Sequence, residues 1–330
     1  MIISFLISFL ITLAVLPKWI KKSQEIGLLW EDMNKWGHPK NVASSGGVIV
    51  VLGFVLGVLA YIAMRTFIIN DSNGINLQIF ALLSVILILA IVGLVDDLLG
   101  WRQGGLSVKF RLFLLLFASI PLVVINAGQS EVMGFNLGLF YPLILIPLGI
   151  MGATATYNFL AGYNGLEASQ GILILSALAI TTYFTGNSWL TIICLCMVAC
   201  LFSFYIFNKF PAKVFPGDIM TYAIGALIAI IAILGNIEKI AIFFFIPYIL
   251  ETILKIRGRL KKQSFAKINE DNSLEMPYEK FYGLEHISIY LISKIKKNKK
   301  VYEKEVVYFI NLFQLLIIFI GFALFWKSIF

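Results

Sequence analysis

The sequence has few charged residues and very few cysteines or histidines. Charged residues make up 13% of the 330, whereas a soluble globular protein has about 25%. Cys194, Cys196 and Cys200 fall in one apolar run without metal-site spacing, and His38 and His286 are far apart. These shortages exclude a disulfide scaffold, a disordered chain and a paired-histidine metal site. Apolar residues instead reach 60%, with 28 Phe, which indicates a multi-span membrane protein.

Long apolar runs predict an all-α, polytopic membrane protein with about ten transmembrane helices. A spanning helix needs about 20 mostly apolar residues. The sequence shows no internal repeat, so we treat residues 1–330 as a single integral-membrane domain. The predicted spans are approximately 1–17, 47–64, 76–95, 109–127, 138–157, 169–185, 188–207, 218–235, 240–255 and 305–326.

The basic residues predict the orientation. Segments 18–46, 96–111, 208–218 and 255–304 hold 23 of the 26 Lys and Arg, and these segments alternate with nearly uncharged loops. By the positive-inside rule, both termini lie outside and the basic loops face the cytosol. The positive charge therefore suits anionic lipid headgroups rather than nucleic acid. The expected cytosolic loops are about 18–46, 96–108, 158–168, 208–217 and 256–304, the last with an amphipathic helix near 287–295.

Acidic residues stand at the predicted cytosolic ends of two spans. Asp96 and Asp97 end the third span, where adjacent carboxylates repel each other and oppose the helix dipole. A cation would relieve this, either a metal or Lys109. Asp218 begins the eighth span, and one or two such acids plus substrate phosphates are how Mg²⁺ is usually held. The simpler alternatives are a solvated aspartate pair and a helix N-cap at Asp218.

A polar run, TYNFLAGYNGLEASQG, follows the fifth span. Its Asn158, Asn164 and Glu167 are accompanied by Gly162 and Gly165, which allow a turn or close approach to a ligand. Carboxamides suit a uracil edge, a ribose or a metal, and turn capping is the alternative. The residues alone therefore predict a membrane protein with a polar site on its cytosolic side. Ionisable residues at membrane depth are candidates for function.

Five motifs in order resemble those of the polyprenyl-phosphate N-acetylhexosamine-1-phosphate transferases, the glycosyltransferase 4 family. They are DMNK from Asp32, VDDLLG around Asp96, NFLAGYNGLEASQ from Asn158, VFPGD ending at Asp218, and LEMPYEKF from Leu274. The likeness is strongest to the eukaryotic and archaeal branch that uses dolichyl phosphate, and it implies an archaeal plasma-membrane enzyme.

The resemblance implies that GlcNAc-1-phosphate passes from UDP-GlcNAc to dolichyl or another polyprenyl phosphate, with UMP released. It implies Mg²⁺, with Mn²⁺ as the alternative, held by Asn158 and Asp218. Lys109 with Asp96 and Asp97 would handle the lipid phosphate. The substrate-binding residues implied are Asp32, Asn34, Lys35, Ser44, Asn164, Glu167, Lys262 and Lys267.

The chain also departs from the family pattern. Ala43-Ser44 stands where the family has a Pro-Glu pair. The family's Arg-His-Arg cluster aligns with Lys262, Gln263 and Ser264, so at best one cation remains there. Lys267 is a candidate substitute, although lysine lacks the bidentate fork of arginine. The bacterial His-rich motif is missing, which argues against a muramyl-pentapeptide substrate. Three alternatives remain: transfer from another UDP-N-acetylhexosamine, a family relative with reduced activity, and a transporter of an anionic solute. The sequence does not decide whether the protein forms a homodimer.

Phosphate chemistry bears on the role of the paired aspartates. A phosphate monoester carries about −1.5 to −2 charge at pH 7, so the attacking lipid phosphate is already ionised. Catalysis then depends on positioning and charge neutralisation. We therefore favour Asp96 and Asp97 as residues that orient the cation and the metal, with proton abstraction as the second hypothesis.

Overall fold

The structure is a computed structural model that describes the chain except residues 1, 71–73 and 133–134. Helices dominate it, and the strands form three two-stranded antiparallel pairs, β1–β2, β3–β4 and β5–β6. The strands are β1 (Leu29–Glu31), β2 (Lys40–Ala43), β3 (Glu131–Val132), β4 (Phe135–Asn136), β5 (Lys267–Ile268) and β6 (Leu274–Glu275). The all-α prediction therefore holds for the helical body, while the β1–β2 and β5–β6 hairpins in polar loops were not predicted.

Seven helical segments within the described residues are long and apolar enough to cross a membrane. Their hydrophobic runs were all predicted. They are α1 (Ile2–Ile26), α2 (Gly47–Met64) extended by the π-helix η1 (Arg65–Ile69), α3 (Ile75–Gln103), α7 (Leu166–Phe184), α8 (Ser188–Asn208), α9 (Gly217–Gly235) and α13 (Glu303–Leu324). The chain is thus a polytopic membrane protein.

The other three predicted spans are shorter or interrupted helices. One is continuous over Tyr141–Tyr157 but shorter than the seven long segments. The other two are interrupted, because proline lacks a backbone N–H, and a new helix begins beside Pro121 and beside Pro247. A hydropathy window does not detect such breaks. The pieces are α4 (Val108–Phe117) with α5 (Ile120–Val124), η2 (Tyr141–Leu145) with α6 (Ile146–Tyr157), and α10 (Glu238–Phe244) with α11 (Ile246–Arg257).

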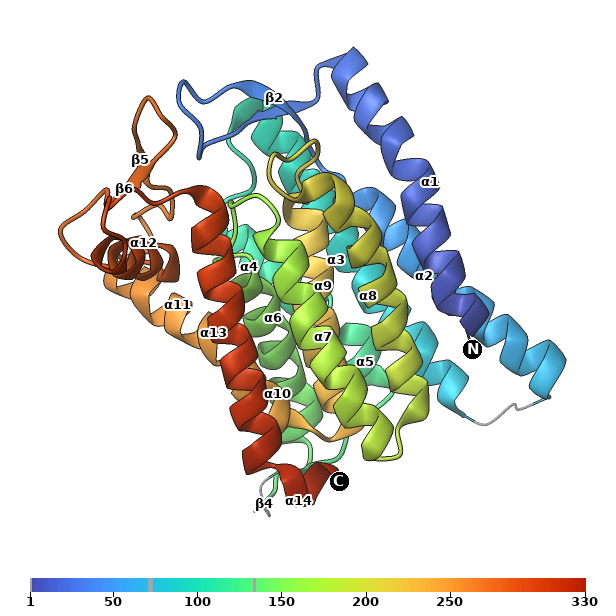
Figure 1. The fold of residues 1–330 in the computed structure, drawn as a ribbon. Coiled ribbons are helices and arrows are strands. Elements are labelled where there is room, and N and C mark those ends of the chain that lie inside the picture. Colours follow the sequence, from blue (N-terminus) through green and yellow to red (C-terminus); the bar gives the residue numbers. More distant parts are fainter. Residues whose placement is uncertain (1, 71–73, 133–134) are drawn as a thin grey trace.

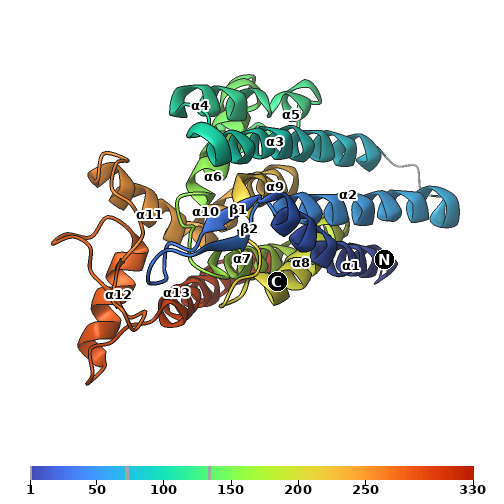
Figure 2. The same ribbon diagram turned by 90° about the horizontal axis from the view of Figure 1, so that it is seen from above.

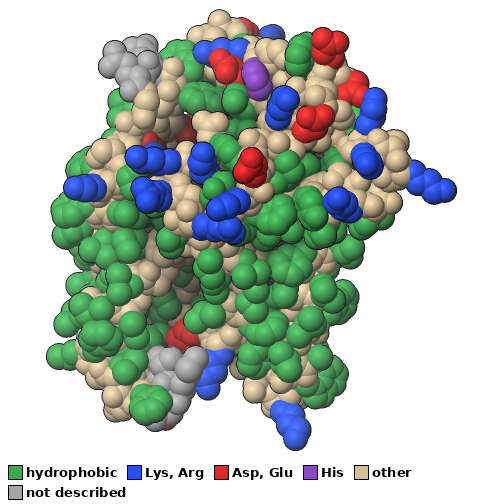
Figure 3. Space-filling model, turned by 90° about the vertical axis from the view of Figure 1, so that its left-hand side faces the viewer, with side chains coloured by type: hydrophobic (Ala, Val, Ile, Leu, Met, Phe, Trp, Pro, Cys, Tyr) green, Lys and Arg blue, Asp and Glu red, His purple; other side chains and the backbone are tan. Residues whose placement is uncertain are grey.

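The two ends of the helical body differ in character. Both termini lie at one end, together with the short α14 (Trp326–Ile329), and the β1–β2 and β5–β6 hairpins lie at the other (Figure 1). Lys and Arg side chains gather towards the hairpin end on the face shown in Figure 3, above a broad hydrophobic belt. This is the pattern expected from an even number of crossings and from the positive-inside rule.

One helix crosses the others at the hairpin end. α12 (Leu284–Ile295) is seen almost along its axis beside the long α13 in Figure 1, and Figure 2 shows it projecting from the bundle next to α11. Its Leu291 and Ile295 are exposed, while Ile289 and Ile292 are buried. The structure therefore contains the amphipathic helix predicted in the last polar loop.

The core is centred on α9. In its most apolar stretch 89% of the residues are buried, more than in any other of the seven long segments. α3 packs against α9 at Gly93, where an added Cβ would stand 2.6 Å from the Cα of Ile219 and 2.7 Å from the carbonyl carbon of Asp218. Because only glycine permits this approach, α3 and α9 bring their polar ends together.

We expect Gly93→Ala to separate α3 from α9, because backbone atoms of α9 cannot move aside as a flexible side chain would. Overpacking of this kind costs about 1–3 kcal/mol, so the midpoint of thermal unfolding in detergent should fall. Gly149→Ala in α6 is the matched control, since nothing lies within 4 Å of its added Cβ. Equal midpoints for the two variants would contradict this account of the packing.

Candidate active site

A cavity of about 310 Å³ lies where α3 ends and α9 begins. α3 contributes Asp96 and Asp97, α9 contributes Asp218, and Asn158 follows α6. Arg111 enters from α4. α3 continues as helix to Gln103, so Asp96 and Asp97 lie inside it and not at its end as predicted. The structure brings them together with Asp218.

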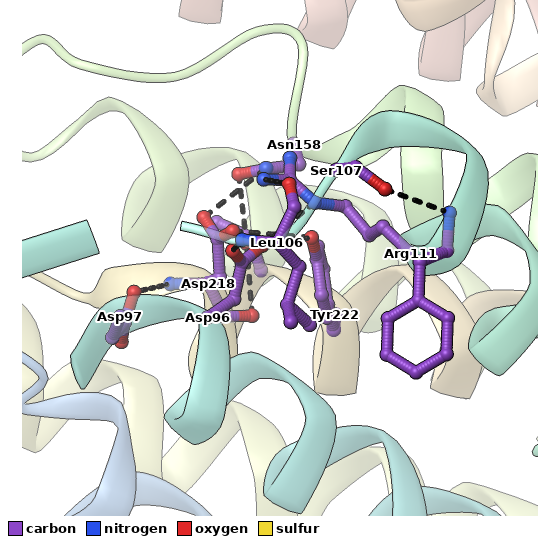
Figure 4. A network of polar contacts seen from close by, with 10 residues as sticks. Asp96, Asp97, Leu106, Ser107, Arg111, Asn158, Asp218 and Tyr222 are labelled. Carbon is purple, nitrogen blue, oxygen red and sulfur yellow. Dashed lines mark hydrogen bonds and ion pairs between the residues drawn. The ribbon is translucent and has the colours of Figure 1, made fainter. Parts of the chain in front are cut away.

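Asp96 makes three contacts (Figure 4). Its Oδ2 lies 2.7 Å from Nε of Arg111, and its Oδ1 accepts a 2.7 Å hydrogen bond from the backbone N–H of Leu106. The hydroxyl of Tyr222 lies 3.3 Å from Oδ2. A turn through two left-handed glycines, Gly104 and Gly105, carries the chain from α3 to this position. Asp96 is 3% exposed, so it is not a solvated carboxylate at the membrane boundary.

Asp97 joins α3 to α9. Its Oδ1 accepts a 2.8 Å hydrogen bond from the backbone N–H of Asp218, in the first turn of α9 (Figure 4). Gly217, with φ +69, lies directly against the Asp97 carboxylate, where a side chain would collide with it. Oδ2 of Asp97 is buried and has no hydrogen-bond partner within the part of the chain that is described. A buried carboxylate oxygen without a partner is a candidate ligand for a cation.

Asp218 is held by two neutral side chains. Nδ2 of Asn158 donates to its Oδ1 at 3.1 Å, and the hydroxyl of Tyr222 lies 3.1 Å from its Oδ2. Thr221 donates to Oδ1 of Asn158 at 3.0 Å, which leaves that amide oxygen one lone pair. Tyr222 and Thr221 follow Asp218 in the first turns of α9, and sequence reasoning did not single them out.

The charges fit a divalent cation. Three carboxylates face one guanidinium, and like charges at such distances are costly unless a cation offsets them. No three His, Cys, Asp or Glu side chains among the described residues are grouped closely enough to hold a metal alone. Mg²⁺ is usually bound by one or two carboxylates plus water and substrate phosphates. Asp97, with its unpartnered oxygen, and Asp218 match that mode of binding.

The cation beside the paired aspartates differs from the one predicted. Arg111 contacts Asp96, whereas Lys109, two residues earlier on α4, is exposed. Residues two positions apart on a helix do not share a face, so only one of the two can point at Asp96. In this structure Arg111 is therefore the cation beside Asp96, and the role of Lys109 stays a prediction.

Three residues predicted to bind substrate form a separate buried network. Asn164 donates from Nδ2 to Asp32 at 3.3 Å, and Nδ2 of Asn34 donates to the carbonyl of Gly162 at 2.8 Å. Glu303, at the start of α13, accepts from the backbone N–H of Asn164 at 2.7 Å. These contacts join the first polar loop, the loop after α6 and α13. Asp32, Asn34 and Asn164 do not line the cavity. They brace these segments, while Oδ1 of Asn34 and of Asn164 is buried without a hydrogen-bond partner among the described residues. Their part in substrate binding stays a prediction.

The predicted lysines also lie away from the cavity wall. Lys35 pairs with Asp32 and has its ammonium 4.8 Å from the ring centre of Phe210. Lys262 is exposed and lies 4.6 Å from the ring centre of Tyr278. Lys267 is exposed and 4.0 Å from Glu275. Arg111 is the one basic side chain in the described lining.

Two other predicted residues do line the cavity, with aromatic residues that the sequence analysis did not assign. Ser44 follows β2, and Glu167 in the first turn of α7 accepts a 2.8 Å bond from the backbone N–H of Gly162. The aromatic residues are Trp30, Phe215 and Phe265. Cavities that bind small molecules commonly combine apolar and aromatic walls with a few placed polar groups.

Comparison with known proteins agrees with this site. Residues 79–236, which include Asp96, Asn158 and Asp218, match the family described as Glycosyl transferase family 4. This chain is 37% identical, over 293 residues, to a protein of Saccharolobus solfataricus. The alignment covers 87% of this chain and 85% of that protein, whose name proposes the activity of a UDP-N-acetylglucosamine–dolichyl-phosphate N-acetylglucosaminephosphotransferase.

More distant relatives carry two different activity names. A Dictyostelium discoideum UDP-N-acetylglucosamine–dolichyl-phosphate N-acetylglucosaminephosphotransferase is 27% identical, covering 75% of this chain and 69% of its own length. A Streptococcus pyogenes phospho-N-acetylmuramoyl-pentapeptide-transferase is 28% identical, with coverage of 76% and 77%. On the match of residues 79–236 and the 37% identity over most of both chains, this protein belongs to glycosyl transferase family 4.

Proposed function

We propose that this membrane protein transfers GlcNAc-1-phosphate from UDP-GlcNAc to dolichyl or another polyprenyl phosphate, with release of UMP. The observation that carries the proposal is the convergence of Asp96, Asp97 and Asp218 with Arg111 in one cavity. Such a site suits a reaction between two phosphate groups, in which negative charge must be positioned and neutralised. The names of the Saccharolobus and Dictyostelium relatives support the same substrates.

The reaction is one substitution at phosphorus. An oxygen of the lipid phosphate forms a bond to the phosphorus that carries the sugar, and the bond from that phosphorus to the oxygen shared with UMP breaks. The lipid phosphate is already ionised near pH 7, so little proton removal is required. Asp96 then orients Arg111 towards the phosphates, and a role as general base is the second hypothesis for Asp96 and Asp97.

Asp97 and Asp218 are the residues placed to hold a divalent metal, with Asn158 beside them. When bound, Mg²⁺, or Mn²⁺ in its place, would supply positive charge to the pyrophosphate and the leaving UMP. The protein's own side chains hold the three aspartates in position. Tyr222 contacts both Asp96 and Asp218, and the Asp97–Asp218 hydrogen bond keeps the two helices in register.

The membrane arrangement proposed is ten crossings with both termini outside. Seven long segments supply seven of them, and the η2–α6 helix and the interrupted pairs α4–α5 and α10–α11 supply the other three. The cavity lies near the basic loops, and by the positive-inside rule this supports a position at the cytosolic face. Transporters usually bind their solute near the bilayer midplane, so this position favours an enzyme.

The donor sugar has one serious alternative. The Streptococcus relative is named for a muramyl-pentapeptide substrate, so another UDP-N-acetylhexosamine is the competing proposal. The sequence lacks the His-rich motif of the bacterial branches, and this favours UDP-GlcNAc. Parallel assays with the other UDP-N-acetylhexosamines decide between the two.

The experiment that tests the reaction uses purified protein in detergent, dolichyl phosphate, Mg²⁺ and UDP-GlcNAc labelled with radioactive phosphorus at the phosphate next to the sugar. We expect the label to enter the lipid fraction as UMP is released. Release of UDP with unlabelled glycolipid would identify an ordinary glycosyltransferase and contradict the proposal. Absence of transfer with every UDP-N-acetylhexosamine would also contradict it.

A further inference from the structure

A second group of buried charged side chains lies between α11 and α12, outside the carboxylate cluster. Glu251 and Glu285 are fully buried, and Lys255 is 9% exposed. Oε1 of Glu251 lies 3.4 Å from the ammonium of Lys255, and Oε2 accepts a 2.6 Å bond from the backbone N–H of Leu284. Neither carboxylate oxygen of Glu285 has a hydrogen-bond partner among the described residues. Two buried acids therefore share one ammonium.

Among the described residues, no second cation is paired with this group. His286 is buried beside Glu285, and its Nδ1 accepts a 3.2 Å bond from the backbone N–H of Tyr282. Burial, and after it the positive charge of Lys255, lowers the pKa of His286 to about 4. The imidazole is neutral at physiological pH. Lys255 is thus the group on which the local charge balance depends.

Lys255 also holds the segment that follows α11. Its ammonium donates a hydrogen bond to the hydroxyl of Ser264, which is itself buried. The carbonyl of Ser264 accepts a 3.3 Å bond from the hydroxyl of Tyr163, a residue of the loop after α6. Ser264 is therefore fixed through its side chain to α11 and through its backbone to the loop that borders the cavity.

The next residue, Phe265, reaches the cavity. It is part of the lining, and its ring packs on Gly162, where an added Cβ would stand 2.8 Å from Cε1. Gly162 has φ +102 and lies beside Glu167 in the wall. An aromatic ring here offers a flat apolar surface to a base or to the apolar face of a sugar. The segment after α11 therefore contributes the ring of Phe265 to the cavity. The family resemblance had instead implied that Lys262 of this segment binds the pyrophosphate.

We infer that Lys255 is a positioning residue for nucleotide-sugar binding. It holds residues 258–266 through Ser264 so that Phe265 closes one side of the cavity against Gly162. This inference rests on the proposed function, since it assigns Phe265 to the UDP-sugar rather than to the lipid. It predicts that the hydrogen bond between Lys255 and Ser264 affects binding of UDP-GlcNAc and leaves binding of dolichyl phosphate unchanged.

Ser264→Ala removes the hydrogen bond between Lys255 and Ser264 but keeps the buried ammonium of Lys255. Losing a hydrogen bond to a charged group loosens the segment, so we expect the KM for UDP-GlcNAc to rise about tenfold, equivalent to about 1.4 kcal/mol. The KM for dolichyl phosphate and kcat should stay within about twofold. Phe265→Ala should give the same pattern, and Lys255→Arg should retain more donor affinity than Lys255→Met. Lys261→Met, at an exposed residue of the same segment, is the matched control.

Two measurements without turnover separate this inference from the proposed function. Hydrogen exchange of residues 258–266 in the ligand-free full chain should be faster in Ser264→Ala than in wild type and in Lys261→Met. Calorimetric binding of UDP-GlcNAc with Mg²⁺ should weaken in the same variant. Unchanged exchange, or faster exchange with unchanged binding, would overturn the role of Lys255. Failure of the wild-type protein to bind UDP-GlcNAc would instead overturn the proposed function.

Discussion

Asp218→Asn should lower transfer of labelled GlcNAc-1-phosphate by more than about 100-fold while the protein still inserts and folds. The substitution keeps the shape of the side chain, and its contacts with Asn158 and Tyr222 can persist. It removes one of the negative charges that we assign to the metal. Changes to groups that merely support a metal ligand cost about 10–100-fold, so loss of a direct contact should exceed that range.

Asp271→Asn is the matched control for Asp218→Asn. Asp271 lies on the polar end of the protein, where Lys300 is 2.5 Å away, and its side chain is 39% exposed. The bond from Lys300 holds the pKa of Asp271 well below its usual range. An exposed pair of this kind contributes little to stability, and it is absent from the cavity lining. We expect wild-type activity from this variant, measured by the same phosphorus-label assay at several Mg²⁺ concentrations.

Retained lipid-linked product in Asp218→Asn would contradict the metal assignment. A partial loss that higher Mg²⁺ restores would support it, because weaker metal binding is then the defect. Thermal unfolding of both variants in detergent separates loss of chemistry from loss of fold. Since Asp218 lies at the contact between α3 and α9, this control is necessary.

Hydropathy predicted the long helices because a spanning segment must be apolar along its whole length. The same reasoning missed the interruptions at Pro121 and Pro247, since proline changes the backbone without lowering mean hydropathy much. Those prolines were visible in the sequence and could have been used. The β1–β2 hairpin was harder to predict because its strands are only three and four residues long.

The sequence predicted Asp96, Asp97 and Asp218 near the ends of apolar runs but could not show that these residues meet. Their meeting depends on Gly93, which lets α3 lie against the backbone of α9. Asn34 and Asn164 have the side chains that a nucleotide site would use, yet in the structure they are buried against Glu303. A polar residue in a loop can bind a ligand or brace two loops, and its type and position fit both roles. Only the tertiary structure separates them.

Arg111→Gln should lower kcat by about 10²–10³-fold, the usual cost of removing one group that stabilises developing charge. Arg111 is the single basic side chain in the described cavity lining, and its Nε is 2.7 Å from Asp96. Negatively charged phosphates must approach a wall that already carries three carboxylates. Without the guanidinium, a bound metal would be left as the main positive charge at the cavity.

Lys109→Gln is a closely matched control, because it removes one positive charge from the same helix two residues away. Lys109 is exposed, so we expect activity within about twofold of wild type, in keeping with the small effects of surface substitutions. Arg111→Lys should fall between the two, since lysine keeps the charge but loses the planar fork that matches a phosphate. All three are measured by release of UMP at saturating substrates.

The opposite result, with Lys109→Gln inactive and Arg111→Gln active, would restore the assignment made from the sequence and show that α4 turns when substrate binds. Thermal unfolding must accompany the assay, because breaking a buried ion pair can cost about 3–5 kcal/mol. Arg111→Lys serves this purpose, since it keeps a cation beside Asp96. If Arg111→Lys folds as wild type and still loses most of its kcat, the loss is catalytic, and the fork of Arg111 acts on the phosphates rather than on the fold.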